Sequence, residues 1–453
     1  MNERVVVISD IHLSQPPVPL MMRHADRLAA FIGALPGRAE DGRRVHLMVA
    51  GDFVDFLALE PFEAFTRDPA VACAKLRHAL GGDNRAVMDA LAGAMRAGVT
   101  LTVMAGNHDL ELAHPAVQRA FVELLGNVPA DPEFVVHGEA WRRGGLLVEH
   151  GNRYDGANEN DWDGMRELVS SQSRGDTLHA QDTFRFGELV TPSAGSRLVA
   201  DVLNTIRDRY PFVPLLQPEG VLTALLLRVL EPALGADWKK LATLFQAQQA
   251  TGRTGPSAPR NIAAVGDDLD AELDAAFPEQ YRALVQPGGV RDIAFGDWVK
   301  LFASERDDSV GRLLRQGKPL PSESLWRLQL LLRRLQAHET TFTAAGDPGP
   351  LGAAAKLMVG RNGIQTVVMG HTHLARSVGQ GAVASYINTG TWTDMVRVPP
   401  AALADADAGR DALGVFLGQL CRDEAGARTF EPGYAEIDLD DGVVVVSRLG
   451  FDR

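Results

Sequence analysis

Near its start the chain carries the sequence Val5-Val6-Val7-Ile8-Ser9-Asp10-Ile11-His12. A short run of β-branched apolar residues indicates a buried strand, and the polar residues after it mark the end of that strand. An apolar run followed by polar residues recurs at 45–55, 99–109, 146–151 and 366–373. The chain therefore repeats one unit, a buried strand that ends in chemically reactive side chains.

Helical segments are expected between these strands, at 27–35 and 85–97. Continuous apolar strands that alternate with helices predict an α/β fold with a mainly parallel sheet buried on both faces. In such a sheet the functional groups gather on the loops after the carboxyl ends of the strands. An antiparallel hairpin is expected from 134–141 and 146–150, and 434–439 with 443–447 should close the sheet.

The pattern changes at residue 153, where amphipathic helical segments and proline-rich breaks replace the strands. Apolar residues at helical spacing occur near 198–206 and again near 238–245. The sequence thus predicts a core in two parts, 1–152 and 353–453, separated by a helical insertion at 153–352.

The composition is that of a globular protein, with 45% hydrophobic and 23% charged residues in 453. Its longest apolar stretch, 221–230, is far shorter than the roughly 20 residues that span a bilayer. The formal charge of -13 disfavours general nucleic-acid binding. Two cysteines, Cys73 and Cys421, are too few for a disulfide framework or a thiolate zinc site. A cytoplasmic protein is expected, with a peripheral place at the inner membrane surface as the alternative.

Five polar motifs follow predicted strands, and each alone is a weak signal. They are Asp10-Ile11-His12, Gly51-Asp52-Phe53-Val54-Asp55, Gly106-Asn107-His108-Asp109, Glu149-His150-Gly151 and Gly370-His371-Thr372-His373. Residues two apart on an extended backbone share a face, so Asp10 and His12 can reach one ion. Imidazole and carboxylate ligands without thiolates suit manganese, iron, zinc or nickel better than magnesium or calcium. The number of ligands predicts two ions, and Asp52 is the candidate bridge between them.

In this order the motifs resemble the signature of the calcineurin-like metallophosphoesterases, over roughly 4–152 and 353–453. The resemblance implies a four-layer αββα sandwich with an inserted helical cap and two divalent metal ions, manganese being the expected one. By analogy one metal takes Asp10, His12, Asp52 and His373, and the other takes Asp52, Asn107, His150 and His371.

His108 is the candidate proton donor, because it lies beside Asn107 and because the family resemblance supports that role. Asp109 is expected to orient its imidazole. Asp55 either holds a bound water or a ligand histidine, or caps the following turn. His114, His137 and His179 have no partner at ligand spacing and are expected to be packed or exposed.

The insertion offers candidate substrate contacts. Arg153 and Tyr154 follow His150 closely and either contact a phosphate or support the root of the insertion. The basic segment 309–338 could bind an anionic membrane or substrate, although packing in the insertion is the commoner situation. The loop 388–392 either presents amides or an aromatic face to the substrate or forms a turn with a packed Trp392, which we favour.

The resemblance implies a hydrolase that cleaves a phosphoester or pyrophosphate bond with metal-activated water. The expected substrate is a phosphorylated small molecule or a lipid-linked phosphate, by analogy with the family branch that cleaves a UDP-linked diacyl sugar. A nuclease or a protein phosphatase of the same fold is the alternative. From another class, a non-catalytic metal-binding scaffold is also considered, and the intact set of ligands counts against it.

Overall fold

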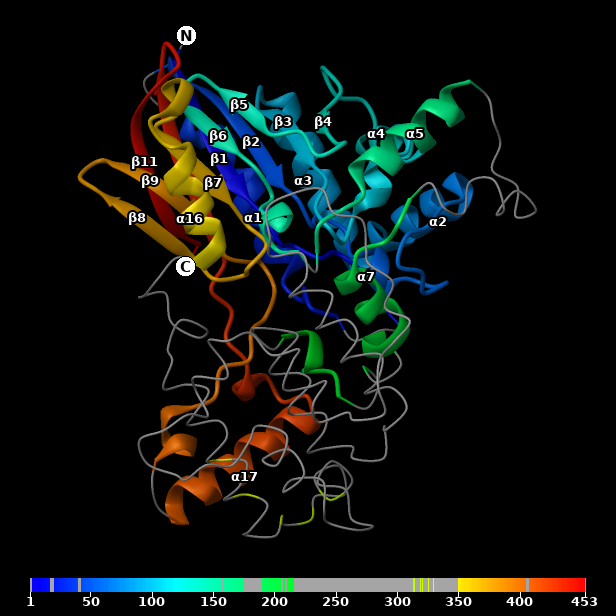
Figure 1. Cartoon of the computed structure of the whole chain (residues 1–453), viewed down its shortest axis with the longest axis vertical. Helices are drawn as coiled ribbons and strands as arrows, with labels where there is room; N and C mark the ends of the chain where they lie inside the picture. Colours follow the sequence, from blue (N-terminus) through cyan, green and yellow to red (C-terminus); the bar gives the residue numbers. More distant parts are fainter. Residues whose placement is uncertain are drawn as a thin grey trace, which may run out of the picture. The chain divides into compact units, whose positions relative to one another are not determined.

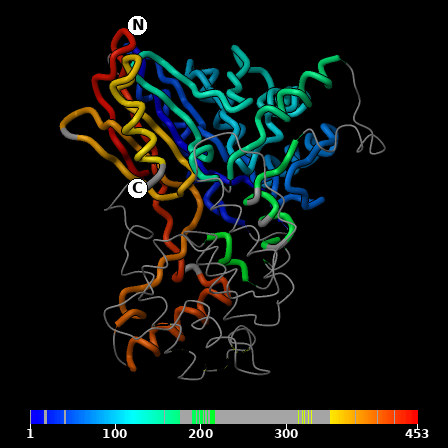
Figure 2. The backbone as a smooth tube through the Cα atoms, viewed as in Figure 1, coloured from blue at the N-terminus to red at the C-terminus, as the bar shows by residue number. Residues whose placement is uncertain are grey.

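The computed structural model describes residues 2–16, 20–39, 42–156, 158–174, 190–204, 207, 210–215, 313, 318, 320, 325, 329, 349–404 and 407–452. They are the coloured parts of the chain in Figure 1 and Figure 2. The chain divides into two compact units. Unit 1 comprises Met1–Asn204, Asp347–Asp394 and Phe430–Arg453, and unit 2 comprises Thr205–Gly346 and Met395–Thr429.

Most of the predicted insertion lies outside the described residues. This holds for the apolar stripe at 238–245, for His179, and for nearly all of the basic segment 309–338. The domain boundaries at 152/153 and 352/353 therefore stay predictions.

The strands of unit 1 form one hydrogen-bonded path. Its order is β4 (Glu133–Val135), β3 (Thr100–Met104), β2 (Arg44–Ala50), β1 (Glu3–Ile8), β10 (Gly433–Asp440), β11 (Val443–Phe451), β9 (Val383–Asn388), β7 (Thr366–Met369), β6 (Leu146–Val148) and β5 (Trp141–Arg143), with β8 (Arg376–Gln380) beside β9. Strands β1 to β4 are mutually parallel, as are β6, β7 and β9. The path has two halves, one from β4 to β11 and the other from β9 to β5. The register of β11 with β9 pairs Ser447 with Val383, and this pair joins the halves.

The two halves face each other, because alternate residues of their strands share one core. Val5 and Val7 of β1 pack in a cluster that also holds Val148 of β6, Val368 of β7 and Ile387 of β9. The intervening residues of β1 belong instead to a second cluster that includes helical residues. Since successive side chains leave opposite faces of a strand, the sheet doubles back on itself as a sandwich.

Helices cover both outer faces of the sandwich (Figure 1). The cluster outside β1 to β3 includes residues of α1 (Ala25–Ala34), α2 (Pro69–Ala79), α3 (Arg85–Arg96) and α4 (Pro115–Leu125). On the other side, α16 (Gly349–Met358) packs Leu351 and Ala355 against Val367 and Tyr386. Helix α3 buries Val87, Leu91 and other residues spaced three or four apart, as an amphipathic helix does. The predicted four-layer αββα order is thus confirmed.

Further helices lie outside these layers. They are α5 (Trp162–Ser173), α7 (Ala194–Leu198) and a π-helical turn, η8 (Val199–Leu203), in unit 1, and α17 (Asp407–Cys421) in unit 2. Short 3-10 turns are η1 (Leu35–Arg38), η3 (Phe56–Ala58), η4 (Gly82–Asn84), η5 (Leu110–Ala113), η6 (Asn152–Tyr154), η9 (Val213–Leu215), η10 (Arg361–Gly363), η11 (Pro400–Leu403) and η12 (Ala425–Ala427). Within the described residues, no helix has the length and apolar character needed to cross a bilayer.

The hairpin expected at 134–141 and 146–150 differs in its first strand. Only β5 pairs antiparallel with β6, whereas β4 pairs parallel with β3. The break falls at His137 and Gly138, whose φ values of 68° and 76° cannot continue an extended strand. The remaining predicted strands agree with β1, β2, β3, β7, β10 and β11 to within two residues at most ends, and β11 continues to Phe451.

Candidate metal centre

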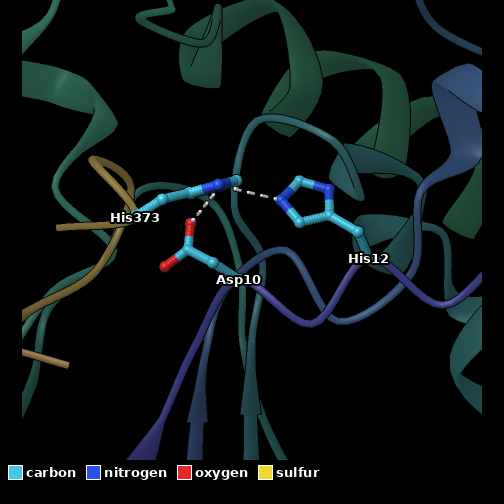
Figure 3. Close-up of side chains that lie close together, drawn as sticks. All are labelled: Asp10, His12 and His373. Carbon is cyan, nitrogen blue, oxygen red and sulfur yellow. Dashed lines mark hydrogen bonds and ion pairs between the residues drawn. The ribbon is translucent and has the colours of Figure 1, made fainter. Parts of the chain in front are cut away.

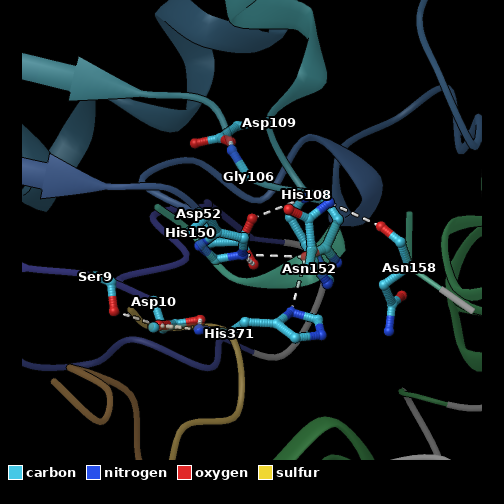
Figure 4. Close-up of polar contacts among 12 residues, drawn as sticks. Ser9, Asp10, Asp52, Gly106, His108, Asp109, His150, Asn152, Asn158 and His371 are labelled. Carbon is cyan, nitrogen blue, oxygen red and sulfur yellow. Dashed lines mark hydrogen bonds and ion pairs between the residues drawn. The ribbon is translucent and has the colours of Figure 1, made fainter. Parts of the chain in front are cut away.

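The predicted ligands come together where the parallel strands end. Asp10 and His12 follow β1, Asp52 follows β2, and Asn107 follows β3. From the other half of the sandwich, His150 follows β6, and His371 and His373 follow β7. Figure 3 shows Asp10, His12 and His373 pointing toward one another, and Figure 4 shows Asp52, His150 and His371 among the polar contacts of the same region. All the predicted ligands therefore belong to one cluster, supplied by both halves of the sheet.

The first group of ligand atoms is centred on His373. Its Nε2 lies 3.3 Å from Oδ1 of Asp10 and 3.1 Å from Nε2 of His12 (Figure 3). Oδ2 of Asp52 lies 3.7 Å from the same atom of His12. All four side chains are buried. Burial lowers the pKa of His12 to about 3, and the neighbouring His108 adds to the shift, so the ring is neutral as a metal ligand must be.

The second group is centred on Asn107. Its Oδ1 lies 3.1 Å from Nε2 of His150 and 3.1 Å from Nδ1 of His371. Nε2 of His150 is also 3.3 Å from Oδ2 of Asp52. The other ring nitrogen of His150, Nδ1, lies 2.8 Å from the carbonyl oxygen of Ala50 and donates to it. In the neutral ring Nε2 therefore carries a lone pair that faces two further acceptor atoms.

Such a set of atoms fits cations. Carboxylate, amide and imidazole acceptors converge in a buried place, where uncompensated acceptors repel one another and are costly to desolvate. Asp52 contacts both groups, which is the arrangement expected of a bridging carboxylate. Divalent ions bound there would polarise a phosphoryl group and make water a stronger acid at neutral pH.

Without a metal, a proton supplies part of the missing positive charge. Burial alone would lower the pKa of the His150 imidazole, but the charge and hydrogen bond of Asp52 outweigh burial and raise that pKa to about 10. Correspondingly, His150 and His108 hold the pKa of Asp52 well below its usual range despite burial. The metal-free centre thus keeps an imidazolium beside a carboxylate.

The backbone at the centre is held in an unusual conformation. Asp10, His12, Asp52, His371 and His373 have φ values of 53°, 52°, 53°, 70° and 58°. Left-handed backbone at non-glycine residues costs of order 1–3 kcal/mol each and persists only where the surroundings impose it. Here hydrogen bonds between the loops after β1 and β2 stabilise this backbone conformation. The amides of residues 11 and 12 both donate to the carbonyl of Asp52 at 2.9 Å.

Glycines of the motifs allow the loops to approach closely. A Cβ on Gly106 would overlap the carboxylate and the backbone nitrogen of Asp52. A Cβ on Gly51, whose φ is 91°, would overlap the ring of His150. The glycines of the second and third motifs are therefore required by the packing of ligands rather than by turn formation alone.

The loop 389–392 fastens the first ligand. Thr391 Oγ1 donates to the carbonyl of Asp10 at 2.7 Å, and the amide of Trp392 donates to the same oxygen at 3.1 Å. The indole of Trp392 is fully buried, donates to the carbonyl of Gly433 at 3.0 Å and packs against Phe31. The prediction that Trp392 packs in the interior of the protein is confirmed. The role of Thr391 was not predicted, because a threonine in a turn carries no specific signal.

His108 sits beside both groups and is oriented by Asp55. Its Nδ1 lies 2.9 Å from Oδ1 of Asp55, and its backbone amide donates to Oδ1 of Asp52 at 2.9 Å. Its ring meets the ring of His12 edge-on, with centroids 4.6 Å apart. Asp55 thus contacts the ring of His108 and does not cap the following turn through its side chain.

The predicted orienting role of Asp109 is wrong in this structure. Its carboxylate accepts hydrogen bonds from the backbone amides of Gly106 at 2.6 Å and Phe53 at 2.7 Å (Figure 4). The side chain turns back toward Gly106 of its own loop and toward Phe53 of the loop after β2, and it satisfies a buried backbone amide in each. Burial, helped by the charge of Asp52, raises the pKa of Asp109 to about 7. Asp109 instead ties the loop after β3 to the loop after β2.

Arg153 and Tyr154 both contact Glu149. The hydroxyl of Tyr154 donates to Oε2 of Glu149 at 2.6 Å, and its ring packs against the cluster under α16. The guanidinium of Arg153 lies 3.8 Å from Oε1 of Glu149, and its side chain is 44% exposed. Tyr154 therefore supports the root of the insertion, whereas a substrate contact by Arg153 stays a prediction.

Two residues beyond the core motifs hold the loop after β3, and the sequence carries no signal for either. Asn160 Nδ2 donates to the carbonyl of Gly106 at 2.8 Å, and Ser196 Oγ lies 3.5 Å from the carbonyl of Asn107. Both side chains are buried. His114 is buried and its Nε2 lies 3.0 Å from the carbonyl of Thr66, consistent with a packed histidine.

Manganese uptake should release protons. At pH 8 the metal-free protein holds His150 protonated, because its pKa is about 10, and a metal ligand must lose that proton. The apparent affinity for Mn²⁺ should therefore rise with pH until about pH 10. Calorimetric titration in two buffers of different ionisation enthalpy measures the proton count. Equal heats in both buffers would contradict the assignment, and His150→Asn should abolish the buffer dependence together with binding.

Asp55→Asn should reduce turnover without removing metal. The amide cannot stabilise an imidazolium at His108 as a carboxylate does, so we expect a fall on the order of 10²-fold with poor leaving groups. Elemental analysis of the purified variant should give the metal content of the wild type. A variant that lost metal instead would show that Asp55 serves the ligands and not His108.

Asp109→Asn should destabilise the protein. The variant leaves one buried backbone amide facing an NH₂ group, which we expect to lower the free energy of unfolding by about 1 to 3 kcal/mol. Urea denaturation measures the change. The control is Asp89→Asn, where the side chain is 61% exposed on α3 and should have no measurable effect. Equal midpoints for the two variants would refute the fastening role of Asp109.

The comparison with known families agrees with this geometry. The family model named calcineurin-like phosphoesterase matches residues 3–187, which include four of the five strand-end motifs. No curated protein matches the chain. Over residues 3–187 the chain is therefore similar to the calcineurin-like phosphoesterase family, whose members are metal-dependent hydrolases that act on phosphoester bonds.

Proposed function

We propose that the chain is a two-metal phosphohydrolase that cleaves a phosphoester or pyrophosphate bond with water as the nucleophile. The observation that carries this proposal is the convergence of buried acceptor atoms from five strand ends, with His108 beside them. The ligand groups are those the proposal requires: Asp10, His12, Asp52 and His373 for one ion, and Asp52, Asn107, His150 and His371 for the other. Manganese is the proposed metal.

His108 is the proposed proton donor to the leaving group. With Nδ1 donating to Asp55, Nε2 is the atom proposed to protonate the leaving group. A neighbouring carboxylate stabilises the imidazolium that a general acid must be before it gives up its proton. The hydrogen bond from the backbone amide of His108 to Oδ1 of Asp52 places the ring next to the ligands.

The proposed substrate is a small or lipid-linked phosphate compound. The net charge of -13 opposes the approach of long polyanions and so disfavours a nuclease. Arg153, which is partly exposed, is proposed to meet a substrate phosphate after leaving Glu149. The helical insertion at 153–352 would cover the centre and select the substrate. A peripheral membrane contact would follow if the substrate is a lipid.

Hydrolysis of a small panel tests the proposal. The panel is p-nitrophenyl phosphate, bis-p-nitrophenyl phosphate, a nucleotide diphosphate-sugar and single-stranded DNA, each with Mn²⁺ and with chelator. We expect chelator-sensitive cleavage of at least one small substrate and none of DNA. Asp52→Asn should lose metal and activity, whereas His108→Asn should keep metal and lose turnover mainly on poor leaving groups. No cleavage by protein with two bound metals would favour a binding scaffold, and preferential cleavage of DNA would favour a nuclease.

A further inference from the structure

An aspartate outside the predicted motifs contacts a predicted ligand. Oδ2 of Asp155 lies 3.0 Å from Nε2 of His371, on the side of the ring opposite Asn107. We infer that Asp155 is a positioning residue that fixes the tautomer and the orientation of His371. The inference rests on the proposed two-metal function and adds a residue from the first loop after the core.

The chemistry of imidazole gives this contact its consequence. A neutral ring carries one N–H, and a carboxylate beside Nε2 holds the proton there. Nδ1 of His371, which lies 3.1 Å from Oδ1 of Asn107, is then left with its lone pair toward the centre. In the other tautomer a proton on Nδ1 would occupy the place of a metal. The carboxylate also makes Nδ1 a stronger donor to a metal.

His371 needs such a partner, because its backbone fixes only the position of the ring and not its rotation. The backbone has a φ of 70°, and its amide donates to both carboxylate oxygens of Asp10, at 3.0 and 2.9 Å. His150 has an equivalent restraint in the carbonyl of Ala50. Asp155 thus restrains the rotation of the His371 ring, as the carbonyl of Ala50 restrains the ring of His150.

Asp155 is itself held by its loop. Asn158 Nδ2 donates to Oδ2 of Asp155 at 2.8 Å, and the carbonyl of Asn158 accepts from Nδ2 of Asn152 at 2.8 Å (Figure 4). The amide of Asp155 donates to the carbonyl of Asn152 at 3.0 Å. Tyr154, through Glu149, anchors the same turn to the core. A carboxylate restrained in this way can orient a ring with little further loss of entropy.

Metal titration of variants tests the inference. Asp155→Ala removes the acceptor, and Asp155→Asn keeps its shape but loses the charge. We expect Asp155→Ala to weaken one of two Mn²⁺ sites by about 10- to 100-fold, with Asp155→Asn intermediate and the other site unchanged. The matched control is Asp163→Asn, which replaces an aspartate whose side chain is 96% exposed. This variant should bind both ions as the wild type does.

A spectroscopic readout separates positioning from general damage to the fold. In histidine labelled with ¹⁵N, the metal-free wild type should show Nε2 of His371 protonated and Nδ1 unprotonated. Asp155→Ala should shift the population toward the other tautomer, and Asp155→Asn should shift it less. Unfolding midpoints in chelator verify that each variant is folded, and Asp155→Asn keeps the test decisive if Asp155→Ala does not fold.

The outcomes distinguish the inference from the function on which it rests. If the wild type binds two Mn²⁺ and both Asp155 variants bind them equally tightly with the tautomer unchanged, the inference is overturned and the proposed function stands. If the wild type binds no Mn²⁺, both are overturned. A selective loss at one site, with the tautomer shift, supports the inference.

Discussion

The close approach of buried oxygen and imidazole nitrogen atoms governs how the rest of this core is arranged. Oδ1 of Asn107 faces two imidazole nitrogens at 3.1 Å, and Nε2 of His12 faces Nε2 of His373 at the same distance. Away from water such pairs repel unless a positive charge lies among them. The sheet edge, the glycines and the left-handed backbone all serve to bring these atoms together against that repulsion.

The restraints come from several distant parts of the chain. The loop after β9 donates to the carbonyl of Asp10, and residues beyond 152 hold the loop after β3 and His371. Because packed elements rather than single side chains place the ligands, a ligand atom can be set within a few tenths of an ångström. The first segment beyond the core motifs is therefore part of the centre as well as the beginning of the insertion.

The sequence was sufficient for the sandwich and for the ligands. Each buried strand is short and β-branched, and each ends in a motif, so the alternation of strands and helices and the order of motifs could both be recognised. The predicted ligands lie together at the strand ends, and their division between two ions stays a proposal. His137 was missed as a strand break, because a left-handed histidine has no sequence signature.

The orientation of side chains could not be predicted. Asp109 directly follows His108 in one motif, and Asp55 belongs to another. The turn geometry nevertheless brings Asp55 to the ring of His108 and turns Asp109 toward Gly106 and Phe53. Asp155 and Thr391 reach the centre from loops whose path depends on tertiary packing. Such residues carry no periodicity, and a spacing rule cannot find them.

The single strand-register pair that joins the halves of the sheet, Ser447 with Val383, gives the centre a part in folding. Asp10, His12, Asp52 and Asn107 belong to one half, and His150, His371 and His373 belong to the other. Ions bound by ligands from both would cross-link the halves in addition to the strand pairing. Ligand binding to the native state alone raises the free energy of unfolding with ligand concentration. Metal binding at the centre would therefore couple the unfolding of the two halves as well as stabilise them.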